Sequence, residues 1–154
     1  MDIWIVPTTS GGEKPWAFVA TPAEELAPAF SPDGKWLSYM SDESGRYEIY
    51  AVAFPGPGGK RQISTGGVTE GGGFIGKGLE VMYGGPGTTL FQVDARTGST
   101  GLEIAPAKAL YKMPLFSTIT GTADGDRMLL AVPPEGQRVS RVGIIANWTN
   151  GLSR

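Results

Sequence analysis

The sequence predicts an all-β protein, and three observations support this fold class. Glycine and proline are abundant, at 24 and 12 of 154 residues, which is about twice their average share. Short runs rich in aromatic and β-branched residues lie between clusters of turn-forming residues. One turn-and-strand pattern also recurs along the chain at a nearly constant spacing. With 40% hydrophobic and 10% aromatic residues, the chain can bury a core.

The clearest element is a tight turn at residues 31–34 that leads into a strand at 35–40. Pro32 presets its backbone angle, Asp33 can hydrogen-bond its own backbone, and Gly34 tolerates a positive φ. The residues that follow alternate and are rich in aromatic side chains, as is typical of a strand. The segment therefore predicts a hairpin.

Further strands are expected on both sides of this turn. Residues 3–6 and 16–20 predict a hairpin, and residues 21–26 predict either one helical turn or, preferably, a loop. Residues 47–54 are apolar on both faces, so this strand is expected to be covered on both sides. The shorter, polar run at 61–64 suits an exposed edge.

The pattern then repeats. Residues 73–83 overlay 29–39, and residues 89–94 follow this second copy as residues 48–53 follow the first. A third copy occupies 122–130, and another inner strand is predicted at 142–146. The turn glycines Gly34, Gly78 and Gly125 are 44 and 47 residues apart. A period in the forties with about four strands per unit is the signature of β-propeller blades.

The N-terminal segment belongs to the same repeat. Residues 2–6 overlay 48–52, so the chain is expected to open with the third and fourth strands of a blade. Blade segments are then predicted at about 1–20, 27–65, 69–111 and 115–150 within a single, partial propeller domain spanning 1–154. The last blade is expected to stop after its third strand, which leaves about three blades per chain.

These residues resemble a known family. Residues 30–39, Phe-Ser-Pro-Asp-Gly-Lys-Trp-Leu-Ser-Tyr, are similar to the repeat motif of TolB-like or WD40-like (PD40-type) β-propellers. The whole chain resembles the C-terminal propeller region of bacterial serine/threonine protein kinases, on residues 43–50, 54–60 and 146–152. The second copy departs from the motif at 75–78, Ile-Gly-Lys-Gly. The resemblance implies blades of four antiparallel strands and does not imply a chemistry.

Three blades do not close a ring, since propellers need about 4–8. An open arc would expose apolar blade faces. We expect a homodimer in which the incomplete first and last blades complete one another, giving a ring of about six blades. The alternative is that the chain is a fragment.

Composition excludes several classes of function. The chain has no histidine and no cysteine, which removes the commonest general base, metal ligand and nucleophile. A net charge of −2 without any basic run gives no reason to expect nucleic acid. No apolar run reaches the ~18 residues of a membrane span, and the start lacks the features of a signal peptide. We expect no cofactor, metal or catalytic residue, and the compartment stays open between cytoplasmic and extracytoplasmic.

Carboxylates are the only candidate binding residues. Glu24, Glu25 and Glu70 precede the first strand of successive blades. Glu25 and Glu70 are therefore predicted to line the central channel and attract a cation or polar ligand, with a solvated loop as the alternative. The run at 31–36 superficially resembles a sialidase Asp box, but its glycine follows the aspartate directly, which favours a structural turn.

The sequence thus favours a non-catalytic propeller module that binds a protein or a small ligand. One alternative is a part of a propeller enzyme of the peptidase-associated, lyase or hydrolase type. Another is a truncated or engineered fragment without independent function.

Overall fold

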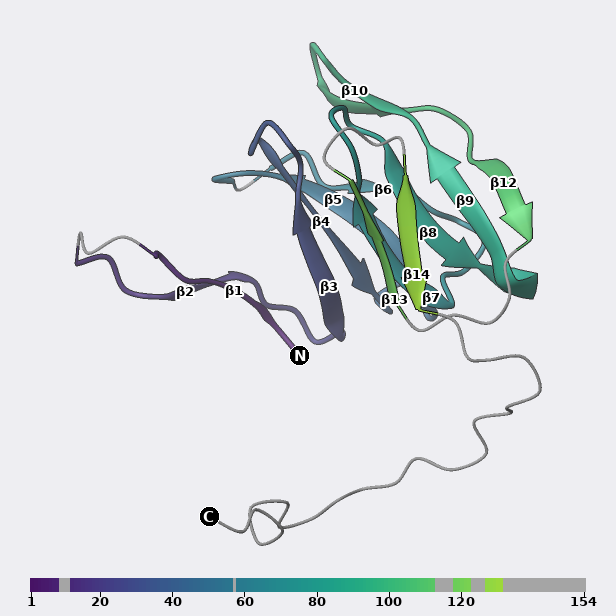
Figure 1. The fold of residues 1–154 in the computed structure, drawn as a ribbon. Coiled ribbons are helices and arrows are strands. Elements are labelled where there is room, and N and C mark those ends of the chain that lie inside the picture. The colour runs from purple at the N-terminus through teal and green to yellow at the C-terminus, as the bar shows by residue number, and fades with distance from the viewer. Residues whose placement is uncertain (9–11, 57, 113–117, 123–126, 132–154) are drawn as a thin grey trace, which may run out of the picture.

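The computed structural model describes residues 1–8, 12–56, 58–112, 118–122 and 127–131 (Figure 1). All strand pairings in these residues are antiparallel. The same residues contain no α-helix and one short 3-10 turn, η1 (Pro86–Thr88). The predicted all-β class is confirmed.

The strands form two full sheets and three hairpins. Sheet I contains β3 (Glu25–Phe30), β4 (Trp36–Ser41), β5 (Glu48–Ala53) and β6 (Arg61–Gln62) in that order. Sheet II contains β7 (Glu70–Phe74), β8 (Val81–Gly85), β9 (Thr89–Val93) and β12 (Lys108–Lys112). The hairpins are β1 (Ile3–Ile5) with β2 (Trp16–Val19), β10 (Ala95–Gly98) with β11 (Gly101–Ile104), and β13 (Thr118–Gly121) with β14 (Met128–Ala131). Both full sheets have four strands, as the repeat predicts.

The turn between β3 and β4 has the predicted geometry. Gly34 has a φ of 68°, and its N–H donates to the Ser31 carbonyl at 2.9 Å. The Ser31 hydroxyl donates to Asp33 Oδ1 at 2.6 Å and accepts the Trp36 N–H at 3.0 Å. One side chain thus ties the turn to the start of the next strand.

The same hairpin closes three times at the predicted spacing. The closing bonds run from N–H to carbonyl at 2.9–3.0 Å, for Ser31 to Trp36, Ile75 to Glu80 and Thr122 to Arg127. The last strand pairs before these bonds are Phe30 with Leu37, Phe74 with Val81, and Gly121 with Met128. In the third copy the Arg127 N–H donates to the Thr122 hydroxyl at 3.2 Å, as Trp36 does to Ser31. The repeat is therefore structural as well as sequential.

The second turn differs from the prediction. Gly78 was expected to take the role of Gly34, but the positive φ lies at Gly76, at 95°. Residues 75–78 lack the Ser-Pro-Asp sequence that holds the turn at 31–34. The chain therefore reverses two residues earlier, and Phe74 still pairs with Val81 as Phe30 pairs with Leu37. Gly125 lies outside the described residues.

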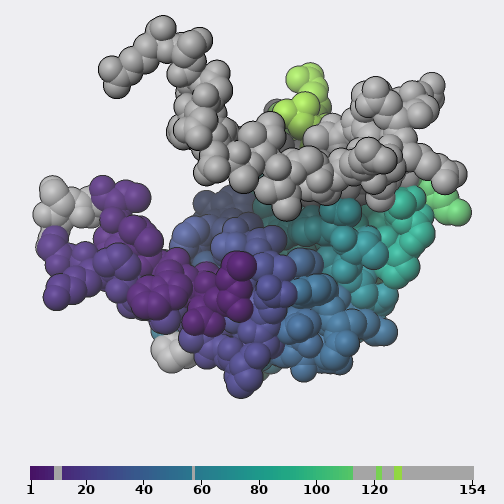
Figure 2. All heavy atoms as spheres, turned by 90° about the horizontal axis from the view of Figure 1, so that it is seen from below, coloured from purple at the N-terminus to yellow at the C-terminus, as the bar shows by residue number. Residues whose placement is uncertain are grey.

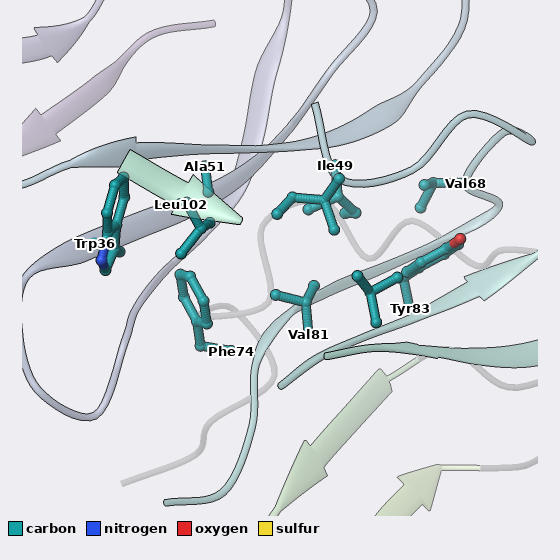
Figure 3. Packing of buried hydrophobic residues seen from close by; sticks show 10 residues of the cluster. Trp36, Ile49, Ala51, Val68, Phe74, Val81, Tyr83 and Leu102 are labelled. Carbon is teal, nitrogen blue, oxygen red and sulfur yellow. The ribbon is translucent and has the colours of Figure 1, made fainter. Parts of the chain in front are cut away.

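Sheets I and II pack face to face around the main core (Figure 3). Trp36, Ile49 and Ala51 of sheet I belong to one buried cluster with Val81 and Tyr83 of sheet II. Because neighbouring residues of a strand point to opposite faces, Leu37 and Tyr39 lie on the other side of sheet I.

The second face of sheet I is covered by the first hairpin. Leu37, Tyr39 and Tyr50 form a buried cluster with Ile3 of β1, and Ile5 packs against it. The strand β1 lies beside β3, while β13 lies beside β7 (Figure 1). Figure 2 shows the purple β1–β2 segment projecting from one side of the blue and teal sheets.

The β10–β11 hairpin was not expected from the sequence. It is inserted between β9 and β12 and reaches back to sheet I, where Trp36 Nε1 donates to Thr97 Oγ1 at 3.3 Å. Leu102 of β11 enters the main core. The signal that was missed is the turn-forming Gly-Ser-Thr-Gly run at 98–101.

The remaining strand predictions have clear outcomes. Residues 21–26 contain no helical turn, because β3 already begins at Glu25, so the loop interpretation is the better one. The exposed polar strand predicted at 61–64 is confirmed only for β6 at 61–62, because Ile63 and Ser64 are buried. The inner strand predicted at 142–146 lies outside the described residues. In the part of the chain that the structure describes, no helix is long and apolar enough to cross a membrane.

Candidate functional site

Ten described strands pair on one side only, and two of them, β1 and β14, correspond in the repeat to the inner strands β5 and β4. In the full sheets, the two middle strands pair on both sides. These are β4 and β5 in sheet I, and β8 and β9 in sheet II. By contrast, β14 pairs only with β13, and β1 pairs only with β2. An unpaired edge presents a row of backbone N–H and C=O groups to a further strand. The edges of β1 and β14 are therefore candidate interaction sites.

Exposed apolar side chains gather at these same hairpins. Trp4 of β1 is 56% exposed, Val6 is 62% exposed, and Leu129 of β14 is 68% exposed. Of the seven large hydrophobic residues exposed in the described segments, five lie in or beside β1, β2 and β14: Met1, Trp4, Val6, Trp16 and Leu129. Four of the five lie in or beside the β1–β2 hairpin, and such a group is typical of a surface that a partner covers.

Glu25, one of the two predicted site residues, is almost completely buried at 1% exposure. It is the first residue of β3 rather than part of the preceding loop. Its Oε1 accepts a hydrogen bond from the Thr21 hydroxyl, and its backbone N–H donates to the Met1 carbonyl at 2.8 Å. Its Oε2 has no hydrogen-bond partner among the described residues.

Glu70, the second predicted residue, is half-buried at the start of β7. It lies opposite Gly84, whereas Glu25 lies opposite Ser41. With the repeat of 44 residues, Glu70 corresponds to Leu26 and not to Glu25. Adjacent strand positions point to opposite faces, so the two carboxylates are not equivalent. That they line a channel stays a prediction.

The third carboxylate considered, Glu24, is engaged locally. It accepts a hydrogen bond from the Tyr47 hydroxyl, which raises the pKa of that tyrosine. Its own N–H donates to Asp42 Oδ1 at 2.8 Å. In the described residues, no group of three or more acidic side chains is arranged to hold a metal ion.

Sequence reasoning missed a fully buried carboxylate, Glu48, at the start of β5. It accepts hydrogen bonds from Arg46 Nε at 2.8 Å, from the Gly67 N–H at 2.9 Å and from the Ser64 hydroxyl. Ser64 Oγ in turn accepts the Ile49 N–H at 2.8 Å. All three partners of Glu48 lie in the loops that precede β5 and follow β6 of its own sheet, which indicates a structural role.

A shallow hollow of about 310 Å³ lies at the base of the inserted hairpin, lined by residues 94–96 and 103–105. Its charged groups are already paired: Arg96 with Glu103 at 2.7 Å and Lys108 with Asp94 at 2.5 Å. The bonds from Lys108 and Gln92 lower the pKa of Asp94. No uncompensated charge in this hollow favours a ligand there.

Comparison with known proteins leaves the chain without an assigned family. No family model matches it, and no curated protein matches it.

Proposed function

We propose that this chain is a non-catalytic β-propeller module of the TolB-like type, in which two chains complete one ring of about six blades. The module binds a protein or a small ligand through its loops or its central channel. Two observations support this proposal: the way in which the sheets stack, and the strands that lack a neighbour among the described residues.

The stacking of the sheets carries the proposal. Sheet I turns the face with Trp36 and Ala51 toward the face of sheet II with Val81 and Tyr83. The residues of sheet I that correspond to Val81 and Tyr83 are Leu37 and Tyr39, which face β1. Each sheet therefore presents the same face to the next one. Repeated sheets stacked in this way, with β3, β7 and β13 as neighbouring inner strands, are expected around a propeller axis.

The number of strands supports two chains per ring. Among the described residues, each chain contributes two full sheets of four strands, and the hairpins β1–β2 and β13–β14 have two strands each. If the hairpins of different chains combine, each chain supplies three sheets and a dimer supplies six. This number lies within the range of about 4–8 blades that closes a propeller ring.

The chemistry of the chain favours binding over catalysis. A sequence without histidine and cysteine lacks the usual general bases and nucleophiles. Of the two predicted channel residues, Glu25 is the stronger candidate for contact with a cation or polar ligand, because its Oε2 is buried without a hydrogen-bond partner in the described structure.

Size-exclusion chromatography with light scattering tests the assembly. We expect the mass of two chains, and a stable, folded monomer would contradict the proposal. Leu129→Asp places a charge on β14, which has a partner on one side only among the described residues, and is expected to shift the mass toward one chain. Tyr111→Asp is the matched control, because Tyr111 is similarly exposed, at 63%, but lies on β12, and it should leave the dimer intact.

Calorimetric titration tests the ligand role of Glu25. Calcium and magnesium are the probes, added separately to the wild-type dimer and to Glu25→Gln. Binding by the wild type that is lost in Glu25→Gln and retained in Glu43→Gln would support this role. An absence of binding by the wild type would remove divalent cations from the proposal.

A further inference from the structure

We propose that the connection between the third and the fourth strand of each full sheet is a latch that fastens this sheet to the unit before it. In sheet II the latch is the inserted β10–β11 hairpin, which makes sheets I and II open as one unit. In sheet I the latch is the shorter connection that begins at Phe54, and the preceding unit is the β1–β2 hairpin. This conformational device goes beyond the proposed function and does not depend on the number of chains in a ring.

The two connections occupy equivalent places in the repeat. Val52 of β5 and Val93 of β9 pair with equivalent residues of the strand before them. Two residues later the connections begin, at Phe54 in sheet I and at Ala95 in sheet II. Each one ends where the fourth strand begins, which is β6 or β12. The β10–β11 hairpin is thus an enlarged form of a connection that the repeat already contains.

The β10–β11 hairpin makes three contacts with sheet I. Thr97 Oγ1 accepts a hydrogen bond from Trp36 Nε1, at the start of β4, at 3.3 Å. At the turn of the hairpin, the Thr100 carbonyl accepts a hydrogen bond from Arg61 Nη2 of the outer strand β6, also at 3.3 Å. Leu102 of β11 is buried in the core between the sheets, near Trp36 (Figure 3). A hairpin that belongs to sheet II therefore holds two strands of sheet I.

The connection in sheet I contacts the hairpin that precedes that sheet. The Phe54 ring packs on Phe18 of β2, with centroids 5.3 Å apart and ring planes inclined by 57°. A Cβ at Gly56 would lie 3.0 Å from Phe18 Cε2, so the backbone of the connection also lies against β2. Since residues 2–6 overlay 48–52 and β2 pairs with β1 as β6 pairs with β5, β2 corresponds to β6. Both connections thus contact the outer strand of the preceding unit.

The β10–β11 hairpin depends on sheet I for its own order. A two-stranded hairpin alone is only marginally stable in water, and the exposed ion pair between Arg96 and Glu103 adds little. Burial of Leu102 and the bonds from Trp36 and Arg61 supply the remaining stability. Opening of sheet I breaks these contacts, and undocking of the hairpin uncovers the core that sheet I shares with sheet II. The two sheets are therefore expected to unfold in one cooperative step.

Replacing residues 95–104 with Asn-Gly removes the latch of sheet II and is compatible with the backbone. The Ala105 N–H donates to the Asp94 carbonyl at 2.9 Å, which is the bond that closes a two-residue hairpin turn. Asn-Gly is a preferred sequence for such a turn. The variant therefore keeps the connection between β9 and β12 without the contacts to Trp36 and Arg61.

Native-state hydrogen exchange of this variant tests the coupling of the sheets. The slowest amides of β4 and β8 are compared, because both strands pair on both sides. In the wild type, we expect the two strands to exchange through one common opening. In the variant, their protection factors should separate by about tenfold or more. A common opening in both proteins would mean that the hairpin only fills the core, and separate openings in the wild type would also overturn the proposal.

Two isosteric substitutions test the latch with the hairpin in place. Thr97→Val removes the acceptor of the Trp36 indole N–H. Thr100→Val is the matched control, because Thr100 is also exposed and contributes its backbone carbonyl. The amides of β10 and β11 should exchange about threefold to tenfold faster in Thr97→Val and at the wild-type rate in Thr100→Val. Equal rates in the two variants would show that Trp36 does not hold the hairpin.

A double-mutant cycle tests the latch of sheet I. Phe54→Leu and Phe18→Leu are made singly and together, and urea denaturation measures each unfolding equilibrium constant. The double variant should depart from additivity by about threefold or more, because the two rings are in contact. Phe54→Leu combined with Tyr111→Leu on β12 is the control and should be additive. Additivity of the Phe54 and Phe18 variants would contradict a latch at this position.

Discussion

Tyr39 on β4 stacks on Tyr50, its directly opposite neighbour on β5, with ring centroids 5.9 Å apart and ring planes inclined by 27°. Tyr83 and Phe91 make the same cross-strand pair between β8 and β9, at 5.4 Å and 16°. The pair therefore recurs at equivalent positions of both full sheets. In sheet II it lies within the core between the sheets, and in sheet I it lies beneath the β1–β2 hairpin.

Removing the Tyr39 ring is expected to destabilise the fold strongly. Tyr39→Ala should lower the free energy of unfolding by about 3–4 kcal/mol, because a fully buried aromatic side chain leaves a cavity. Tyr39→Phe keeps the stacked ring and should cost less than about 1 kcal/mol. Urea denaturation followed by tryptophan fluorescence measures both. A loss in Tyr39→Ala no larger than that of the exposed control Tyr111→Ala would contradict the buried stack.

The buried tyrosines also predict a loss of stability in alkali. Burial, together with the nearby carboxylates of Glu43 and Glu25, raises the pKa of Tyr39 above its ordinary value of 10.0. Burial and Glu48 raise that of Tyr83. The stabilisation is fully present below about pH 10. Above that pH the unfolded chain releases the protons first, so stability falls by up to about 1.4 kcal/mol per pH unit and tyrosine.

The measurement is a series of urea denaturations between about pH 8 and about pH 11. Tyr39→Phe removes one of the titrating groups, so its stability should fall less steeply than that of the wild type over this range. Parallel curves for the two proteins would show that Tyr39 ionises equally easily in both states.

Glu48 is expected to be essential for the stability of sheet I. Glu48→Ala leaves the Ser64 hydroxyl and the Gly67 N–H without their acceptor and should cost about 3 kcal/mol. Glu103→Ala removes an exposed ion pair with Arg96 and should change stability by less than about 0.5 kcal/mol. Thermal and urea denaturation compare the two variants. Equal effects would mean that the buried network contributes no more than a surface pair.

Gly72 in β7 is required by close packing of the backbone. A Cβ at this position would lie 2.0 Å from the Met82 carbonyl oxygen, and a carbonyl of a paired strand cannot move aside cheaply. Gly72→Ala should therefore cost at least about 2 kcal/mol. Gly66→Ala is the matched control, since a Cβ there meets nothing within 4 Å. Denaturation midpoints measure both, and a stable Gly72→Ala variant would contradict the pairing of β7 with β8.

Local pattern was sufficient to predict the hairpins and their spacing. The turn at 31–34 was predictable because Ser31, Asp33 and Gly34 form its hydrogen bonds within six residues. The alignment of β9 with β5 was also predictable, since both strands pair with the preceding strand in the same register. Strand pairing across a short turn depends on neighbouring residues, and these are visible in the sequence.

Other features depended on contacts between distant residues. Nothing local to Glu48 indicated that Ser64 and Gly67 would surround it. The inserted hairpin is held by Trp36, which is 61 residues away from Thr97. Such contacts arise only when the sheets are stacked.

The sequence by itself determined an all-β chain, the period of its repeat and the order of strands within each sheet, because turn chemistry and alternation act over a few residues. Only the tertiary structure decided which faces the sheets bury against one another and which strand edges stay unpaired. Those outcomes follow from long-range packing, in which a face or an edge is satisfied by residues far away in the chain. In the part of the chain that the structure describes, β1 and β14 each keep one edge without a partner, and both carry exposed apolar side chains.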